Sequence, residues 1–386
     1  MRVTEPHTGE EPAVSSVSHR GFTHLGLDVS KDSISVAVLE PESDRAAVRK
    51  IFHDESSVRR LIGGLGDRSK LWACYEAGPT GYELYRLLTA LGVRCDVVAP
   101  SLVPKRRGDR IKTDNRDAKM LAGLHRAGEL TGVAVPSPPQ EAVRDLCRTR
   151  GDMVEDLTQA RNRLNHFLLR HSIVWRDGSN WTLNHRRWLA GLRFDDRALA
   201  TTFGHYHATI EVREHSLKAV ERDLADYYDE PPFGASSHRL AAYRGVTRMG
   251  GLCLAAEIFD WRRFPAARSF MSFTGLVPSE DSSGLHEHRG NITHAGNRHV
   301  RAQLVEAAWS YRHRPHVGAG IAARHHGLAP DVVARAWHAQ LRLSRRFHHL
   351  AARKNVQSVV ATAIARELAG FLWAEMTADT AARPHE

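Results

Sequence analysis

The order of strand and helix patterns between residues 23 and 100 constrains the fold of this chain more than any other feature. Three strand patterns come first and are joined by turns: THLGLDV (23–29), SISVAVLE (33–40) and AAVRKIFH (46–53). A helix at 56–65, a strand at 71–77, a helix at 80–92 and a strand at 93–100 then alternate. Hairpin-linked strands followed by strict alternation predict a mixed sheet in an α/β domain.

This order also separates two classes of α/β domain. A doubly wound nucleotide-binding domain would open with a βαβ unit and a GxGxxG turn, and the sequence has neither here. The observed order is that of a ribonuclease H-like sheet. Helix signals resume at Thr113, an expected N-cap, and run to about Leu130 before the proline-rich segment VAVPSPPQEAV. We therefore expect a ribonuclease H-like domain over residues 21–135.

A long amphipathic stretch follows this domain. Residues 143–171 carry apolar side chains at alternating spacings of three and four, which is typical of a coiled-coil seam. A second such stretch lies at 210–227, while Arg150 and His171 interrupt the first seam. Two helices of this length pair with each other or with another chain, and the spacing leaves both arrangements open. We expect a helical coiled-coil assembly region at 136–236.

The remainder of the chain, residues 237–376, is expected to form a mainly α-helical domain. A glycine-rich turn at 244–251 lies between two helical stretches, where such turns either offer backbone amides to a phosphate or form tight packing corners. A long polar segment at 275–301 precedes the last helices, and loops of that length are usually functional. The terminal segments 1–20 and 377–386 are expected to be disordered tails.

Composition excludes several classes of protein. A hydrophobic content of 42% with 25% charged residues is typical of globular domains, not of disordered chains. No apolar run approaches the ~18 residues of a membrane span, and the first twenty residues lack the apolar core of a signal peptide. These observations predict a soluble cytoplasmic protein with no membrane partner. The cysteines are far apart and suggest neither a zinc site nor a disulfide framework: Cys74, Cys95, Cys147 and Cys253.

The position of the positive charge is more informative than the formal total of +10. Residues 286–353 contain eleven arginines against three acids, an excess of eight positive charges. A second basic cluster comes just before an acidic pair and consists of Lys105, Arg106, Arg107, Arg110 and Lys112. Clustered cations neutralise phosphates and release counterions, so they indicate a nucleic-acid partner. A solvated helix face is the ordinary alternative for one such run, but two separate clusters favour nucleic acid.

Four carboxylates stand where the predicted topology would bring them together. Asp28 ends the first strand, Glu76 ends the strand LWACYE, and Asp114 and Asp117 lie three apart on one helix face. In a ribonuclease H-like sheet these two strands are neighbours and the last helix packs beside them. Gathered carboxylates repel unless divalent cations lie between them, so two Mg²⁺ ions about 4 Å apart are the predicted cofactors. Taken singly, each acid has an ordinary explanation as a turn or helix-start residue.

The segment PSEDSSGLHEHRG (278–290) is a candidate nucleophile loop. Ser282 and Ser283 directly precede a glycine and are followed by His286, His288 and Arg289. A serine hydroxyl needs a base or a metal to take its proton and cations to hold the phosphoryl oxygens. The same residues are common in polar surface turns, and their spacing alone does not decide. The histidines do not have zinc-site spacing, because no HxxxH motif or cysteine partner accompanies them.

Four motifs together resemble one known family. They are LDVSK (27–31), YEAGPTG (75–81), VAPSLVPKRRGDRIKTDNRDAKMLA (98–122) and GLVPSEDSSGLHEHRGNITHAGNRHVR (275–301). The chain resembles the insertion-sequence 110 family of transposases, also called DEDD transposases, from about residue 23 to 376. The spaced aspartates of KTDNRDA and the serine loop, in this order, are more specific together than either alone.

The resemblance implies roles for these residues. It implies a RuvC-like nuclease domain whose metal-binding tetrad is Asp28, Glu76, Asp114 and Asp117. It makes Ser283 the nucleophile that becomes covalently joined to DNA. Because Ser282 directly precedes Ser283, this assignment depends on a one-residue register. Thr293 is followed here by His294, where related sequences often have a basic residue after the hydroxyl.

The resemblance also implies partners. Residues 143–229 correspond to a coiled-coil region used in assembly, and related proteins form dimers and tetramers with composite active sites. Related proteins use a structured noncoding bridge RNA to choose target and donor DNA. The expected nucleic-acid contacts are the basic cluster at 105–112 and the arginines that follow the serine loop: Arg289, Arg298 and Arg301.

These observations predict a Mg²⁺-dependent DNA transposase that mobilises an insertion sequence through a covalent serine link. Two alternatives belong to other classes. A metal-dependent nuclease or junction resolvase would use water as the nucleophile, so Asp28→Asn would abolish cleavage and Ser283→Ala would not. A noncatalytic nucleic-acid-binding or assembly protein would break no strands at all, but it would leave the spacing of Asp114 and Asp117 unexplained.

Overall fold

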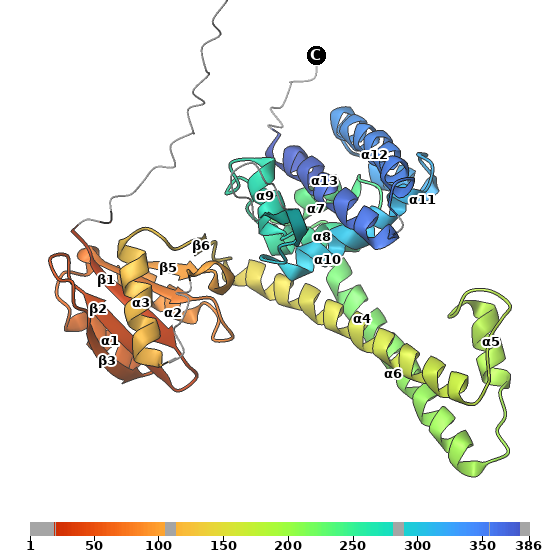
Figure 1. Cartoon of the computed structure of the whole chain (residues 1–386), viewed down its shortest axis with the longest axis horizontal. Coiled ribbons are helices and arrows are strands. Elements are labelled where there is room, and N and C mark those ends of the chain that lie inside the picture. The colour runs from red at the N-terminus through yellow and green to blue at the C-terminus, as the bar shows by residue number, and fades with distance from the viewer. Residues whose placement is uncertain (1–18, 20, 105–112, 281–288, 355, 379–386) are drawn as a thin grey trace, which may run out of the picture. The chain divides into compact units, whose positions relative to one another are not determined.

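The computed structural model describes residues 19, 21–104, 113–280, 289–354 and 356–378. The chain divides into two compact units, Met1–Val135 and Pro136–Glu386 (Figure 1). The first is a mixed α/β unit and the second is mostly helical. Within the described part of the chain, every helix is too short or too polar to cross a lipid bilayer.

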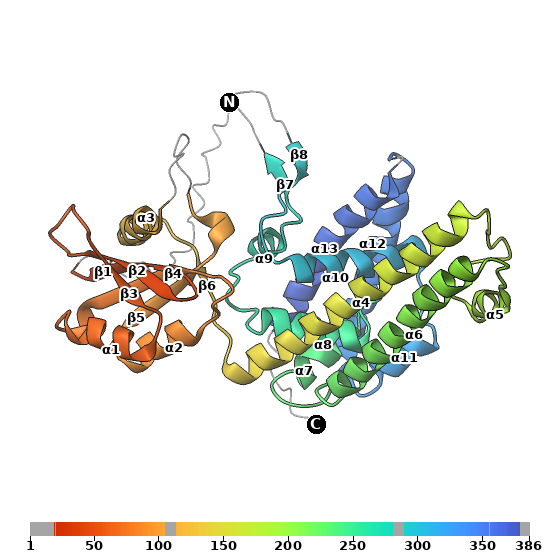
Figure 2. The same ribbon diagram turned by 90° about the horizontal axis from the view of Figure 1, so that it is seen from below.

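The first unit is built on a six-stranded mixed sheet with the order β3-β2-β1-β4-β5-β6. Its strands are β1 (Thr23–Val29), β2 (Ser33–Leu39), β3 (Ala47–Phe52), β4 (Leu71–Glu76), β5 (Arg94–Val98) and β6 (Gly132–Val133). β1, β4 and β5 are mutually parallel, and β2 is antiparallel to both β1 and β3. Figure 2 shows α1 (Glu55–Gly63) and α2 (Glu83–Ala90) on one face and α3 (Asp114–Arg126) on the other.

Alternation along β1 decides which side chains meet which helices. Leu25 and Leu27 are buried in the apolar core that contains residues of α1 and α2. Because successive side chains of a strand point to opposite faces, His24, Gly26 and Asp28 lie on the face covered by α3. The predicted strand therefore carries a core on one face and polar or small residues on the other.

The structure corrects two helix boundaries in this unit and adds one short strand. The predicted helix at 80–92 begins only at Glu83, because Gly81 adopts a left-handed conformation with φ +69°. The helix expected to reach residue 130 ends at Arg126, since Gly128 has φ +72° and stops it. β6 was not predicted, because two residues are too few to show alternation.

Two long antiparallel helices, α4 (Pro138–Arg170) and α6 (Arg197–Ala225), form the first part of the second unit. The sequence left open whether such helices pair within the chain, and the structure packs them against each other. Arg150 ion-pairs with Glu221 across the two helices at 2.8 Å. His171, expected in the seam, lies just beyond the last turn of α4 and is exposed.

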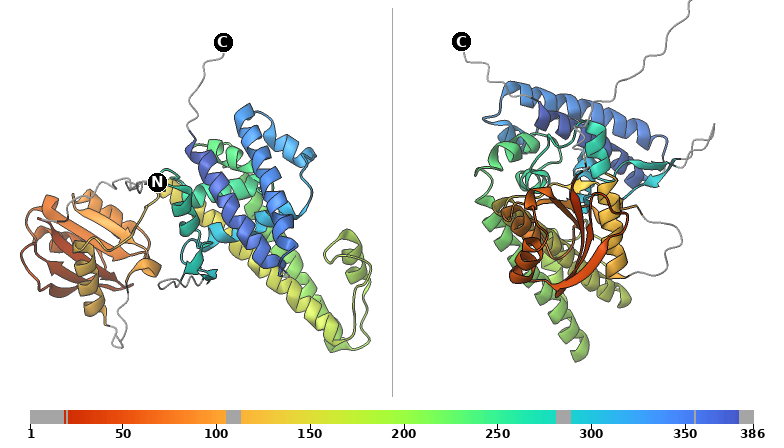
Figure 3. Two further views of the ribbon diagram at one scale, coloured as in Figure 1. Left: turned by 45° about the horizontal axis from the view of Figure 1, so that its top comes forward. Right: turned by 90° about the vertical axis from the view of Figure 1, so that its left-hand side faces the viewer.

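The C-terminal helices share a core with the base of this long pair. They are α7 (Gly234–Ala241), α8 (Arg248–Ile258), α9 (Ala267–Phe273), α10 (Arg298–Ala308), α11 (Ala319–His325), α12 (Pro330–Ala351) and α13 (Gln357–Thr377). Val143 of α4 and Leu224 of α6 belong to the same apolar core as these helices. A separate core at the far end of the pair includes Phe167 and Leu189, the latter from the connecting helix α5 (Leu183–Gly191) (Figure 3).

The predicted glycine-rich turn at 244–251 is a packing corner. α8 begins at Arg248, so the later glycines are helical. Gly245 has φ +86°, and a Cβ there would lie 2.2 Å from the carbonyl oxygen of Ala307. A Cβ at Gly251 would lie 2.5 Å from the carbonyl oxygen of Ser237. Glycine at these two positions lets backbone segments pack against each other. Close packing therefore explains the glycines without a bound phosphate.

Candidate active site

Close packing of α3 on β1 sets the position of the acidic residues. A Cβ at Gly26 would lie 2.1 Å from the carbonyl oxygen of Ala118 and 2.5 Å from the amide nitrogen of Ala122. Only glycine fits at this point of the strand, and the facing helix residues are alanines. The helix backbone therefore rests directly on β1.

The direction of α3 places its first turn at the carboxyl end of β1. His125 in the last turn lies 3.0 Å from His24 near the start of β1, measured between the two Nδ1 atoms. The helix thus runs opposite to the strand. Asp114 and Asp117, in the first turn, lie toward the end of β1 that carries Asp28.

A row of side chains across the sheet confirms this placement for Asp114. Asp28 of β1 is the register partner of Ser35 of β2, which is the partner of Lys50 of β3. Register partners share a face of the sheet. The Lys50 ammonium donates to Oδ2 of Asp114 at 3.5 Å, so the start of α3 lies over this row.

Glu76 lies on the same face at the end of the neighbouring strand. Leu27 of β1 is the register partner of Tyr75 of β4, so the next residues along the two strands are Asp28 and Glu76. Two positions earlier, the Cys74 thiol donates to the carbonyl oxygen of Leu121 in α3, at 3.6 Å. The structure therefore puts all four predicted acids on the α3 face, at the carboxyl ends of β1 and β4.

The acidic residues are open to solvent, with a buried hydroxyl beneath them. Glu76 and Asp114 are exposed, whereas Asp28 and Asp117 are half-buried. The Ser35 hydroxyl, directly beside Asp28, is buried and has no hydrogen-bond partner among the described residues. A set of carboxylate oxygens suits hard divalent cations such as Mg²⁺ better than transition metals. The residues present thus fit a divalent-cation site.

Residues 281–288 of the predicted nucleophile loop, with Ser282 and Ser283, lie outside the described residues. The same holds for the basic cluster Lys105, Arg106, Arg107, Arg110 and Lys112. The structure describes the strands on either side of the loop, β7 (Pro278–Glu280) and β8 (Arg289–Ile292), which pair as an antiparallel hairpin. Pro278 pairs with Ile292 at its base. Arg289, a predicted nucleic-acid contact, is the first residue of β8.

Arg301 holds the base of this hairpin. Its Nη1 donates to the carbonyl oxygens of Thr274 at 2.9 Å and His294 at 3.3 Å. Gly296 supports the same contact, because a Cβ there would lie 2.1 Å from the carbonyl oxygen of Phe273. The structure thus shows a structural task for Arg301, which the sequence suggested as a nucleic-acid contact. Arg298, three residues earlier, is exposed.

A buried ion pair links the hairpin base to α4, and nothing in the sequence pointed to it. The Asn297 side chain caps α10 by accepting from the His299 and Val300 amides, and its Nδ2 donates to Glu257 at 2.8 Å. Arg148 of α4 donates through Nε and Nη2 to both oxygens of Glu257, at 2.7 and 3.0 Å. Burial alone would raise the pKa of Glu257, but these hydrogen bonds and the arginine charge hold it below its ordinary value.

The predicted basic segment separates into inward and outward arginines on α12. Arg335 points inward and donates to the fully buried Glu375 at 2.6 Å. A groove of about 820 Å³ lies on the outward face and is lined by His338, Leu341, Arg342, Arg345, Arg346, His349 and Glu367. Its α12 residues recur at spacings of three and four, so they form one stripe along the helix. This spacing is visible in the sequence, so the stripe could have been predicted from it.

Known proteins share sequence with both units of this chain. Residues 25–173 match a family model described as a transposase, and residues 237–320 match the model of the transposase IS116/IS110/IS902 family. A putative transposase, y4qE of Sinorhizobium fredii, is 41% identical over 91% of this chain and 87% of its own length. The transposase for insertion sequence element IS1533 of Leptospira borgpetersenii is 34% identical over 85% of this chain and 96% of its own length. A probable family 20 transposase of Pseudomonas aeruginosa is 26% identical over 94% of this chain.

Proposed function

Because this chain belongs to the IS110 family of transposases, we propose that it mobilises an insertion sequence by serine-dependent DNA recombination at the acidic site of its first unit. The observation that carries this proposal is the convergence of Asp28, Glu76, Asp114 and Asp117 from three distant segments onto one face of the sheet.

The sheet supports a ribonuclease H-like, RuvC-like assignment for the first unit. Its first five strands have the order β3-β2-β1-β4-β5, with β2 antiparallel to its neighbours. This is the order expected from three hairpin-linked strands followed by alternating helices and strands. Nuclease chemistry in such a domain belongs at the ends of β1 and β4, where the acids lie.

Proteins of this family use divalent metal ions. The four carboxylates would hold Mg²⁺, most simply two ions, and the ions when bound would lower the pKa of the attacking hydroxyl and stabilise charge at phosphorus. The chain itself orients the ligands. Gly26 lets the backbone of α3 approach β1, which sets the position of the first turn of α3 over the strand ends.

Ser283 is the proposed nucleophile, with Ser282 as the neighbouring alternative. Its hydroxyl oxygen forms a new ester bond to a backbone phosphorus, while one phosphodiester P–O bond of the DNA breaks. The serine proton leaves to a base, and the released deoxyribose hydroxyl takes up a proton. The number of phosphoester bonds is unchanged. A hydroxyl group of another DNA strand can therefore displace the serine from phosphorus without a separate energy source.

The proposed catalytic form is a dimer or tetramer with composite sites. The serine hairpin belongs to the second unit, whereas the acids belong to the first. Arg148 of α4 reaches the base of the hairpin through Glu257 and Asn297. Assembly through the α4–α6 pair, the coiled-coil region of the resemblance, would therefore act directly on the element that carries the serine.

DNA and a structured noncoding guide RNA are the proposed partners. Arg345 on the α12 stripe and the exposed Arg298 offer cations for phosphate contacts. Arg342 and Arg346 of the stripe pair with Glu367, at 3.6 and 3.2 Å, and would exchange this carboxylate for a phosphate. Binding of this kind releases counterions, so the affinity falls steeply with salt. Charge contacts do not read sequence, which leaves target choice to base pairing with the RNA.

The covalent link gives the decisive test. Wild-type protein incubated with element-end DNA and Mg²⁺ should yield a protein–DNA adduct that survives denaturation, and Ser283→Ala should abolish it. Ser282→Ala is the matched control and should retain it. An adduct that persists in Ser283→Ala but not in Ser282→Ala would move the nucleophile by one residue.

Strand cleavage separates the transposase from a water-dependent nuclease or resolvase. In the proposed mechanism, Asp28→Asn and Ser283→Ala both abolish cleavage. If Ser283→Ala still cleaves at the wild-type rate while Asp28→Asn does not, water is the nucleophile. Adding or withholding the noncoding RNA transcribed beside the gene tests guidance in the same assay, because recombination should require that RNA.

A further inference from the structure

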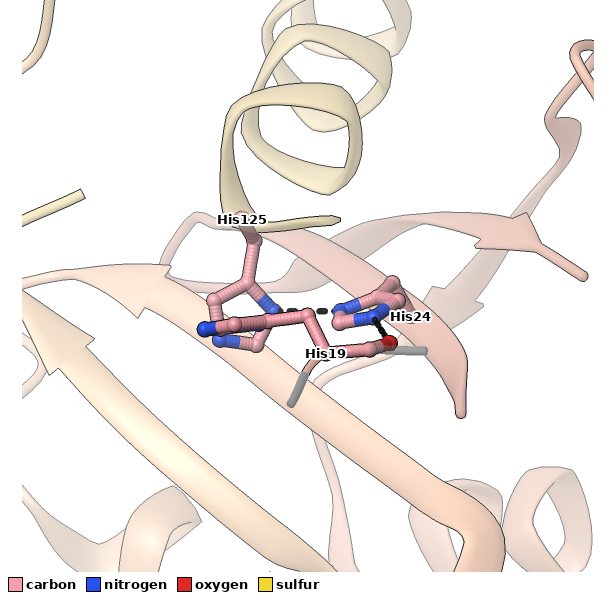
Figure 4. Close-up of side chains that lie close together, drawn as sticks. All are labelled: His19, His24 and His125. Carbon is pink, nitrogen blue, oxygen red and sulfur yellow. Dashed lines mark hydrogen bonds between the residues drawn. The ribbon is translucent and has the colours of Figure 1, made fainter. Parts of the chain in front are cut away.

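A second group of ligand atoms lies at the opposite end of β1 and α3 from the acids, and Figure 4 shows its three histidines. His19 precedes β1, His24 is in the first half of β1, and His125 is in the last turn of α3. One ring nitrogen of each lies within 4.8 Å of the others. His24 and His125 are fully buried, with exposed fractions of 0% and 2%.

Hydrogen bonds at Nε2 of His24 and of His125 leave the Nδ1 atoms of these two rings facing each other. Nε2 of His24 lies 3.1 Å from the carbonyl oxygen of His19, and Nε2 of His125 lies 3.0 Å from Oδ2 of Asp96. Both acceptors carry no proton, so each Nε2 must be the N–H donor. In the neutral rings the two Nδ1 atoms then carry lone pairs, and they lie 3.0 Å apart. Two lone pairs at that distance repel unless a cation, either a proton or a metal ion, lies between them.

The third ring favours a metal ion over a shared proton. Nδ1 of His19 is buried and has no hydrogen-bond partner among the described residues. Its ring stacks on Trp72 at 4.4 Å, and Trp72 in turn donates through Nε1 to Asp96 at 2.8 Å. A proton shared by His24 and His125 would leave Nδ1 of His19 without a partner. A metal ion can accept a lone pair from each of the three rings.

The surroundings are those of a metal-binding histidine set. Histidine ligands usually donate their second ring N–H to a carboxylate or a backbone carbonyl, which fixes the tautomer. His125 does so to Asp96 and His24 to the His19 carbonyl.

We propose that His19, His24 and His125 bind one transition-metal ion of the Zn²⁺ class, with Asp96 orienting His125. Three imidazoles suit Zn²⁺ rather than Mg²⁺ and leave one coordination position for water. Such an ion would join the segment before β1 to the end of α3. Its role is structural and separate from DNA cleavage, because about two turns of α3, roughly 12 Å, lie between His125 and Asp117.

Metal titration of the full-length protein tests the site. Protein stripped with a chelator should bind one Co²⁺ per chain with the visible absorption of a tetrahedral complex, and Zn²⁺ should displace it. His19→Ala should weaken binding at least tenfold, and Asp96→Asn should weaken it about 10- to 100-fold, the usual effect of losing an orienting partner. His19 precedes the sheet, so its removal leaves the strand pairing intact.

Two control variants test whether Co²⁺ binds at the three histidines and not elsewhere in the protein. His53→Ala removes a half-buried histidine of the same unit, whose Nδ1 lies 2.8 Å from the carbonyl oxygen of Ser30, and should not change Co²⁺ affinity. Asp114→Asn alters the acidic site and should not change it either, so a failed Zn²⁺ site and a failed Mg²⁺ site are distinguishable. Equal Co²⁺ affinity in wild type and His19→Ala, or the absence of a tetrahedral spectrum, would overturn the proposal in favour of a shared proton.

Discussion

Carboxylates in the two units of this chain have opposite surroundings. In the helical unit, Glu375 is fully buried and accepts from Arg239 at 2.8 Å and Arg335 at 2.6 Å. Glu214 likewise accepts from Arg161 and Arg186, at 2.6 and 2.7 Å. At the edge of the sheet, Asp114 is 54% exposed and lies 3.5 Å from a lysine that is itself exposed.

The difference shows how one residue type serves two purposes. A buried carboxylate that is held by guanidinium groups stabilises the fold and has no oxygen left for a ligand. Acids gathered at an open edge contribute little to stability, but they can receive cations from solution. The comparison therefore predicts that substitutions at the edge remove activity without unfolding the protein. Substitutions of the buried carboxylates in the helical unit should instead destabilise the fold without removing a catalytic group.

The largest expected effect is on catalysis. Asp114→Asn should lower Mg²⁺-dependent strand cleavage on the order of 10³-fold or more, because metal stabilisation of the transition state is worth several kcal/mol. Its free energy of unfolding should change by less than about 1 kcal/mol, since exposed ion pairs contribute little. Cleavage assays and urea unfolding measure the two quantities. Asp44→Asn removes a similar exposed pair, with Arg126 at 3.3 Å, and should leave both unchanged.

The next effect is on stability in the helical unit. Glu375→Gln should lower the free energy of unfolding by about 3–5 kcal/mol, because it leaves buried cationic partners without their carboxylate. Urea denaturation of the purified variant measures this. Glu83→Gln, which alters an exposed pair with Arg86, is the control and should cost less than about 0.5 kcal/mol. A loss below about 1 kcal/mol for Glu375→Gln would contradict the comparison.

A smaller effect depends on pH. The hydrogen bond from Arg186, followed by that from Arg161, lowers the pKa of Glu214 from 4.5 to about 2. The unfolded chain therefore takes up the proton first, so the stabilisation is fully present above about pH 4.5 and is lost as the pH falls toward 2. Glu214→Gln should cost about 2 kcal/mol at neutral pH. The stability difference between wild type and this variant should shrink on acidification, and a constant difference from pH 6 to pH 2 would refute the assignment.

The smallest effect tests the lysine that contacts Asp114. Lys50→Gln should raise Mg²⁺ affinity about two- to threefold, because it removes a positive charge close to Asp114 at a solvated site. Mg²⁺ dependence of cleavage measures it. Lys70→Gln changes the net charge equally at a different exposed position and should have no effect. Equal shifts in both variants would mean that only the overall charge matters.

Local patterns predicted the sheet and the place of the acids. Strand alternation and turn residues gave β1 to β5 nearly to the residue, and the order of elements put Asp28 and Glu76 on neighbouring strands. The same alternation set Gly26 on the face of Asp28. Two helix boundaries moved at a glycine, because α2 begins only after Gly81 and α3 ends before Gly128.

Contacts between distant segments were decided by the tertiary structure alone. Arg148 and Glu257 are 109 positions apart, and His24 and His125 are 101 apart. Periodicity tells which face of a helix is buried, but not which partner it meets, because that depends on how whole elements pack. For the same reason the sequence could not decide whether α4 and α6 pair within the chain. By itself, the sequence predicted that Asp28, Glu76, Asp114 and Asp117 lie at one edge of the sheet, whereas packing across a hundred residues assembled the histidines and tied the β7–β8 hairpin to α4.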